Sequence, residues 1–240
     1  MTGSMKSPRE RYREQVREEV KEKAWQQIAG SGASALSLNA IAKQMGMSGP
    51  ALYRYFANRD ELITELVRDA YRSLADAFIA SAAASADGGA GRTGLARLAQ
   101  VLRRWALEDP HRYFLVYGTP VPGYHAPPDV TETASEMMSV LLDACATPGT
   151  ESRSHAFEEH LAAHRAWAGS HPDAPPSALR LALTFWSRLH GVLSLELAGH
   201  FTGMGLDPAL LYQAEVDALG GVPSPGPDQS PVTLALADNS

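Results

Sequence analysis

The segment covering residues 37–61, SLNAIAKQMGMSGPALYRYFANRDE, constrains the fold more than any other part of the chain. Its first apolar residues recur at the spacing of one helical face, and Ser37 precedes them, where it can accept a hydrogen bond from an unpaired helix amide. Gly46 suits the left-handed backbone that ends many helices. Ser48 can cap a second helix, and Pro50 fits its first turn because a missing amide costs little there. The segment therefore predicts two short helices joined by a tight turn.

The second helix combines an apolar inner side with an unusual outer side. Leu52 and Phe56 lie four residues apart and are expected to point inward together. A second helix that follows such a turn and presents small, aromatic and basic residues is how a protein inserts a helix into the DNA major groove. The residues left on the outer side are Gly49, Pro50, Ala51, Tyr53, Arg54 and Tyr55.

In pattern and spacing, this segment resembles the TetR family of bacterial repressors over about the first third of the chain. Tyr55 stands where the family more often has His, and Arg59 where it usually has Lys, and both keep the ability to bind phosphate. The glycine and proline that begin the second helix leave few side chains for direct base readout. The matching motifs are Ile41-Ala42, Gly46-Met47-Ser48, Leu52-Tyr53-Arg54-Tyr55-Phe56 and Asn58-Arg59-Asp60-Glu61-Leu62.

The resemblance implies a DNA interface on these helices and at the start of the next. Hydroxyl and guanidinium groups suit phosphate oxygens, so Tyr53, Tyr55 and Arg59 are expected to contact the DNA backbone. The small residues at the start of the second helix offer apolar contact to thymine methyl groups, and Arg54 could reach either groove or backbone. The predicted DNA-binding residues are Ser37, Asn39, Ser48, Gly49, Pro50, Ala51, Tyr53, Arg54, Tyr55 and Arg59.

Charge is distributed unevenly along the chain. The net charge of −6 argues against a protein that is basic throughout. Residues 1–70 nevertheless carry +2, whereas residues 71–240 carry −8. We therefore expect the N-terminal part to face DNA and the acidic remainder to face away from phosphate.

Cysteine content and hydropathy favour a cytoplasmic protein. Cys145 is the only cysteine and cannot form an internal disulfide, which fits a reducing compartment. No apolar run reaches the roughly 18 residues of a membrane span, so no membrane partner is expected. Residues 1–8 lack the apolar core of a signal peptide.

Long helices are expected on both sides of the DNA-binding segment. In the helix predicted for residues 9–29, Arg13, Arg17 and Lys21 lie four residues apart. They form either a solvated charged face or a set of contacts to the DNA backbone. A second long helix is expected from Asn58 to about residue 85, and it would link the two parts of the molecule because no Pro or Gly interrupts it.

The whole pattern predicts an all-α fold with two domains. Residues 9–71 are expected to form a three-helix DNA-binding domain with a helix-turn-helix. Residues 72–221 are expected to form a larger helical domain that binds a ligand and a second copy of the chain. Residues 222–240 are rich in Pro, Ser and Asp and are expected to be a disordered tail.

Aromatic and sulfur-containing side chains fall on several helices of the larger domain. Residues 111–128, HRYFLVYGTPVPGYHAPP, form either a pocket wall or lid, or a connector whose aromatics fill the core. Converging helices of this kind commonly enclose an apolar cavity with a few polar anchors, although the same rings could pack together and leave none. The candidate anchors are Tyr117, Tyr124, His125 and His164. The remaining predicted pocket residues are Trp105, Tyr113, Phe114, Met137, Met138, Leu141, Trp167 and Phe185.

The most apolar helix, residues 177–201, carries two apolar faces and is expected to be buried on both. One face would pack on its own domain and the other on a second copy, because one recognition helix reads only half of a palindromic site. Its W-x-x-x-H-G motif resembles the C-terminal domain of one TetR branch. The predicted dimer interface comprises Trp186, Leu189, His190, Val192, Leu193, Leu197, Tyr212 and Val216.

The family resemblance implies a repressor that binds double-stranded operator DNA as a homodimer and is released by a small, largely apolar effector. Catalysis, cofactors and metals are not expected: G-x-S-x-G and Cys-x-x-Cys are absent, and His160 and His164 lack the adjacent Glu of a metalloprotease helix. Two alternatives remain. One is a DNA-binding protein with a filled core and no ligand, and the other is a helical metal-dependent enzyme that uses the histidines at positions 155, 160 and 164.

Overall fold

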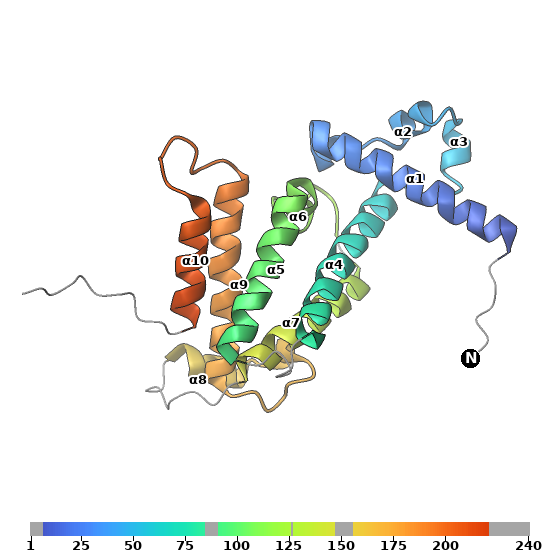
Figure 1. Ribbon diagram of the computed structural model, residues 1–240. Helices are drawn as coiled ribbons and strands as arrows, with labels where there is room; N and C mark the ends of the chain where they lie inside the picture. The colour runs from blue at the N-terminus through green and yellow to red at the C-terminus, as the bar shows by residue number, and fades with distance from the viewer. Residues whose placement is uncertain (1–6, 85–90, 126, 147–155, 221–240) are drawn as a thin grey trace, which may run out of the picture.

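The computed structural model describes residues 7–84, 91–125, 127–146 and 156–220. Every regular element among them is helical, which confirms the predicted all-α class. Residues 87–90 and the tail predicted for residues 222–240 lie outside the described residues. Figure 1 shows the N-terminal helices at one end of the molecule and the last two helices at the other.

The N-terminal part packs around an apolar core of its own. Val16, Val20, Ala24 and Ile28 form the buried stripe of its first helix, as their four-residue spacing requires. That helix begins in a capping box formed by Ser7 and Glu10. The elements of this part are α1 (Pro8–Ser31), η1 (Ala33–Ala35), α2 (Leu38–Gln44), α3 (Gly49–Leu52) and the first half of α4 (Arg59–Ala83).

Helix α4 is shared by two cores, as its uninterrupted sequence predicts. The buried residues of α4 up to Val67 belong to the N-terminal core. Its buried residues from Ala70 onward belong to the C-terminal core. The Asn58 side chain caps the helix by accepting the Glu61 amide at 2.8 Å. The Glu61 carboxylate accepts the Ala57 amide at 2.6 Å, one residue before the position that a standard capping box uses.

The C-terminal part is a bundle in which α4, α5, α7 and α9 enclose the larger core. Arg103 on α5 and Glu196 on α9 form a two-pronged ion pair at 2.5 and 2.7 Å that fastens these helices together. Helices α9 and α10 lie side by side at the edge of the bundle (Figure 1). The elements are α5 (Gly91–Glu108), α6 (Pro110–Tyr117), α7 (Pro128–Cys145), α8 (Ala156–Ala163), η2 (Ala166–Ala168), α9 (Pro176–Leu197) and α10 (Pro208–Leu219).

Apolar spacing in residues 154–168 predicts one helix with Phe157 and Leu161 inside, but the structure interrupts that helix and exposes Phe157. Helix α8 ends at Ala163 and η2 follows it. Phe157 was expected inside but is 42% exposed, whereas the neighbouring Glu158 is buried and pairs with Arg180 at 2.6 Å. Glu158 and Leu161, three residues apart, share the face that meets α9, and this leaves Phe157 on the flank.

Candidate DNA-binding interface and effector region

Helices α2 and α3 and the turn between them form a helix-turn-helix. Ser37 caps α2 by accepting the Ala40 amide at 3.3 Å. Gly46 has a φ of 65°, the left-handed conformation that its place after α2 predicts. The expected side-chain cap from Ser48 is absent from α3. Pro50 has no amide to donate there, and the Ala51 amide already donates to the Ser48 carbonyl at 3.0 Å.

The outer side of this unit is polar and accessible. Tyr53 is 45% exposed despite its large ring. Lys43, in the last turn of α2, is also exposed, and sequence reasoning missed it although its basic charge was available as a signal. Of the other predicted DNA-binding residues, the structure exposes Asn39, Ser48, Pro50 and Arg54, and half-buries Ser37, Gly49, Ala51, Tyr55 and Arg59.

A close approach between the two helices explains the glycine that begins α3. A Cβ atom on Gly49 would lie 3.3 Å from the side-chain oxygen of Asn39 on α2. A larger residue would therefore displace Asn39, one of the predicted DNA-binding residues. Gly49 and Asn39 together fix how closely α3 approaches α2.

Arg17 holds the end of the helix-turn-helix against α1 and α4. Its guanidinium donates to the Tyr55 carbonyl, forms ion pairs with Glu61 at 3.6 Å and Glu65 at 3.2 Å, and lies 4.1 Å from the centre of the Phe56 ring. Arg17 was expected to be either a solvated charge or a contact to the DNA backbone, and neither role describes these contacts within the chain. Arg17 instead connects α1 and α4 to the turn that follows α3.

The other two cations of the α1 face also have partners inside the chain. Arg13 donates to the Arg54 carbonyl at 3.2 Å. Lys21 bonds to Asp69 on α4 at 2.6 Å and to Glu18 at 2.7 Å. The face thus packs α1 against the elements that present the DNA-reading surface.

Arg59 has partners that the sequence did not predict. One guanidinium nitrogen, Nη2, donates to the carbonyls of Ala33 at 2.9 Å and Ser34 at 3.3 Å. These contacts tie the first residue of α4 to η1. A phosphate contact by Arg59 stays a prediction. In such a contact the guanidinium would also keep its hydrogen bonds to η1.

The structure brings most of the predicted pocket residues into one cluster within the C-terminal core. Tyr124 packs instead against the N-terminal core, where its hydroxyl accepts a hydrogen bond from the Thr64 hydroxyl at 3.2 Å. His125 and His164 are exposed, so their prediction as buried anchors is wrong. The clustered residues are Trp105, Tyr113, Phe114, Tyr117, Met137, Met138, Leu141, Trp167 and Phe185.

Tyr117 lies at the centre of a group of rings that pack on one another. Its ring centroid is 4.3 Å from that of His190 and 5.7 Å from that of Trp186. Tyr113 is 5.4 Å away and Trp105 is 6.4 Å away. These rings fill at least this part of the predicted cavity with one another, in agreement with the alternative left open above.

Two polar atoms in this ring cluster are buried without a hydrogen-bond partner, namely the Tyr117 hydroxyl and His190 Nε2. The other ring nitrogen of His190 lies 3.0 Å from the Tyr113 hydroxyl. Burial lowers the pKa of His190 to about 3, so the imidazole is neutral at physiological pH. The two atoms can therefore bond an uncharged polar group.

Most of the predicted dimer-interface residues are buried within the single chain. Leu189, Leu193 and Tyr212 are fully buried in the C-terminal core, and His190 and Trp186 belong to the ring cluster. Val192 and Val216 are also buried, and Leu197 packs partly against the same core. These residues use the apolar faces of α9 and α10 to close the chain's own bundle, and interface roles for them stay a prediction.

The histidines considered for metal binding pack on each other. The His160 and His164 rings stack at 4.1 Å, and Nδ1 of His164 lies 2.9 Å from the His160 carbonyl. Among the described residues, no three His, Cys, Asp or Glu side chains gather in a way that could hold a metal ion. No helix in the described part of the chain combines the length and apolar character that a membrane crossing requires.

A helix-turn-helix carried on a helical body defines a DNA-binding transcriptional regulator. Family models support the class over most of the chain. Residues 22–66 match the model for bacterial regulatory proteins of the TetR family, and residues 95–219 match the tetracyclin repressor-like C-terminal domain. The chain belongs to the TetR family, which confirms the resemblance in both parts of the sequence.

Similar proteins agree with this class. The HTH-type transcriptional regulator Rv1816 of Mycobacterium tuberculosis is 33% identical over 221 residues, which cover 88% of this chain and 93% of that protein. A crystal structure of SCO4313 is 65% identical, with a TM-score of 0.80, and covers 90% of this chain and 100% of that one. A structure of a protein from Rhodococcus sp. RHA1 shares the fold. It is 22% identical, with a TM-score of 0.61, and covers 86% of this chain and 94% of that one.

Proposed function

We propose that this TetR-family regulator represses transcription by binding a palindromic operator as a homodimer, and that a small, largely apolar effector releases it. The observation that carries the DNA-binding half is the exposed surface of α2 and α3, which Arg17 holds in place from α1 and α4. Such a regulator works beside the chromosome, in the cytoplasm. Membership of the family favours a regulator over the enzyme considered above.

Arg54 provides the most direct test of the DNA-facing surface. Its side chain is exposed beside Tyr53, so removal should cost phosphate or base contacts and little stability. Arg54→Ala is expected to weaken operator binding by about tenfold and to reduce the salt slope by about one. Fluorescence anisotropy over a range of salt concentrations measures both quantities.

The matched control is Arg104→Ala, which removes the same charge from an exposed position on α5. It should leave operator affinity and salt slope unchanged, because α5 belongs to the part of the chain that faces away from DNA. If Arg54→Ala and Arg104→Ala lost the same operator affinity, the loss would be a general effect of net charge, and Arg54 would not belong to the interface.

A different face of α9 and α10 supports the homodimer. Gly191, Leu195 and Ala198 are exposed along α9 at helical spacing, and Leu210 and Ala214 continue the exposed surface on α10. Leu210 is 71% exposed, which is unusual for a large apolar side chain. Exposed apolar residues on two helices that pack together are typical of a protein interface, and the two-fold symmetry of a palindrome requires a second copy.

The effector proposal rests on the ring cluster. Tyr117 and His190 offer two buried polar atoms among aromatic rings, and His190 is neutral. The rings fill this region, so a compound with apolar bulk and one uncharged hydrogen-bonding group would have to separate them to bond to these atoms. Helix α4 borders this cluster through Tyr71 and continues to the DNA-binding part, so a ligand that prefers one position of α4 shifts the spacing of the recognition helices.

A further inference from the structure

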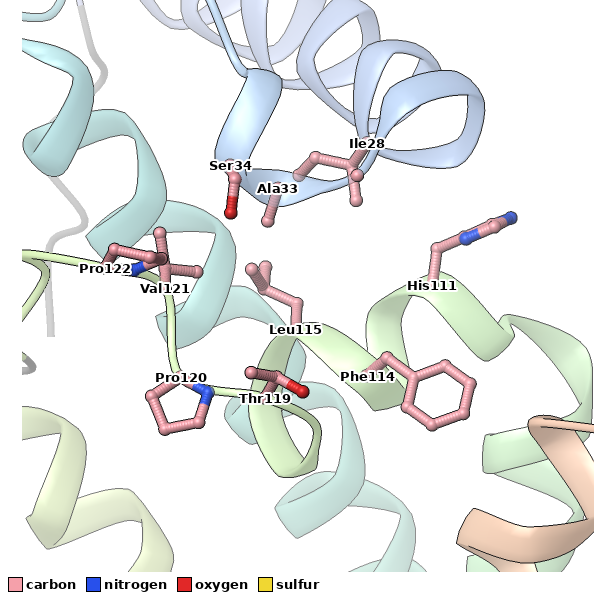
Figure 2. A pocket seen from close by; sticks show the side chains of 11 residues that line it. Ile28, Ala33, Ser34, His111, Phe114, Leu115, Thr119, Pro120, Val121 and Pro122 are labelled. Carbon is pink, nitrogen blue, oxygen red and sulfur yellow. The ribbon is translucent and has the colours of Figure 1, made fainter.

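A cleft lies where the N-terminal and C-terminal parts of the chain meet. It is a cleft of about 340 Å³ between the end of α1 with η1 on one side, and α6 with the segment that follows it on the other. Figure 2 shows Leu115 pointing from α6 toward Ala33 of η1 across this cleft. Phe114 is the one predicted pocket residue that lines the cleft, and its ring centroid lies 5.5 Å from that of Tyr113 in the ring cluster.

The chemistry of the walls suits an uncharged molecule. Ile28, Leu115 and Val121 supply apolar surface, and the hydroxyls of Ser34 and Thr119 supply hydrogen-bonding groups. None of the described residues that line the cleft is Asp, Glu, Lys or Arg, although the imidazole of His111 lies among them. The volume lies within the roughly 300–1,000 Å³ range of small-molecule sites.

The wall that follows α6 is held firmly in place. A Cβ atom on Gly118 would lie 2.5 Å from the Phe114 carbonyl, so the tight turn out of α6 depends on a glycine. Beyond the turn, Val121 is buried in the N-terminal core and Tyr124 bonds to Thr64 of α4. The sequence left this segment as a pocket wall, a lid or a connector, and it forms one wall of this cleft.

The opposite wall is connected directly to the DNA-reading elements. Ser34 lies three residues before Ser37, the cap of α2. The carbonyls of Ala33 and Ser34 also accept hydrogen bonds from Arg59, the first residue of α4. A displacement of η1 would therefore act on α2 along the chain and on α4 through the Arg59 guanidinium.

We propose that this cleft is a binding site for a small, uncharged, largely apolar molecule, and that its occupant weakens operator binding by moving η1 away from α6. The second half of the proposal rests on the proposed operator binding. A molecule that fits a wider separation of η1 and α6 favours that state and releases DNA to the extent that its affinities for the two states differ.

Covalent attachment of an apolar group tests the site without a known ligand. Thr119→Cys places an exposed thiol at the cleft, and benzyl methanethiosulfonate converts it to a benzyl disulfide with release of methanesulfinate. Methyl methanethiosulfonate provides the matched small label, and dithiothreitol reverses both. The native Cys145 is buried, and burial raises its thiol pKa to about 12, so it has almost no reactive thiolate near neutral pH.

Two quantities are measured for each labelled protein: the melting temperature and the affinity for the operator that the wild type protects. The benzyl label should raise the melting temperature by about 3 °C over the methyl label, because its ring is buried in the cleft. It should also weaken operator binding at least about tenfold. Ser34→Cys repeats the experiment from the opposite wall, and Asp173→Cys, exposed before α9, is the control that should show neither effect.

Equal melting temperatures for the benzyl and methyl labels at both cleft positions would overturn the site. A benzyl label that stabilises the protein but leaves operator affinity unchanged would overturn the regulatory half, as would equal effects at Asp173→Cys. If the wild-type chain binds no operator, both the proposed function and the proposed regulation through the cleft fail. The melting temperatures of the benzyl- and methyl-labelled proteins still decide whether the cleft binds an apolar group.

Discussion

Leu210→Asp is expected to give a monomer whose operator affinity is about 10²–10⁴-fold below that of the wild type. Leu210 is exposed on α10, which packs against α9, and it belongs to the face proposed for the second copy. A carboxylate there would lose water on association without gaining a partner, which strongly disfavours the dimer. Sedimentation velocity at micromolar concentration reports the assembly state, and anisotropy reports the affinity.

The control for this experiment is Ile79→Asp on α4. Ile79 is 41% exposed, and α4 packs mainly against α5, α6 and α7, so its aspartate variant should remain a dimer with normal operator affinity. Val192→Asp is unsuitable as a test because Val192 is buried in the chain's own core. A wild-type protein that sediments as a monomer, or a Leu210→Asp variant that sediments as a dimer, would contradict the proposed interface.

Arg17→Ala is expected to have the largest effect on the DNA-binding part itself. It removes a charged hydrogen bond to the Tyr55 carbonyl, two ion pairs to α4 and the contact with the Phe56 ring. These losses should lower the free energy of unfolding by about 2 kcal/mol. Operator affinity should fall at least about tenfold because the end of α3 loses its attachment to α1 and α4.

The salt dependence of binding separates a positioning role from a phosphate contact. If Arg17 acts by holding the Tyr55 carbonyl, Arg17→Ala weakens binding without changing the salt slope, in contrast to Arg54→Ala. Arg17→Lys keeps the charge but loses the planar fork and should fall between alanine and wild type. An Arg17→Ala variant with the melting temperature and operator affinity of the wild type would show that the contacts of Arg17 contribute to neither property.

Local patterns in the sequence were sufficient to predict the helices and the helix-turn-helix. Ser37 and Asn58 cap helices as expected, because a short polar side chain before a helix can accept a hydrogen bond from one of its unpaired amides. The continuous α4 also follows from the absence of Pro or Gly between Asn58 and Ala83. These features depend on neighbours along the chain, so one sequence contains enough information to find them.

Features that depend on distant partners could not be predicted. Leu189 and Leu195 are both leucines on α9, and periodicity alone does not indicate that the first closes the chain's own core and the second is exposed. The sequence suggests a surface charge at Arg17 because its partners, Tyr55 and Glu65, lie 38 and 48 residues further along the chain. The aromatic residues of the pocket were identified as a group, but their packing against each other depends on helix positions that the pattern does not specify.

DNase I footprinting of the purified chain on the DNA that flanks its own gene tests the central claim most directly. The account predicts one protected palindrome whose half-sites are centred about one helical turn, ~34–36 Å, apart. Protection should weaken for Arg54→Ala and disappear for Leu210→Asp at the same protein concentration. Protection of a single half-site, or full protection by the Leu210→Asp monomer, would contradict a dimeric operator-binding regulator.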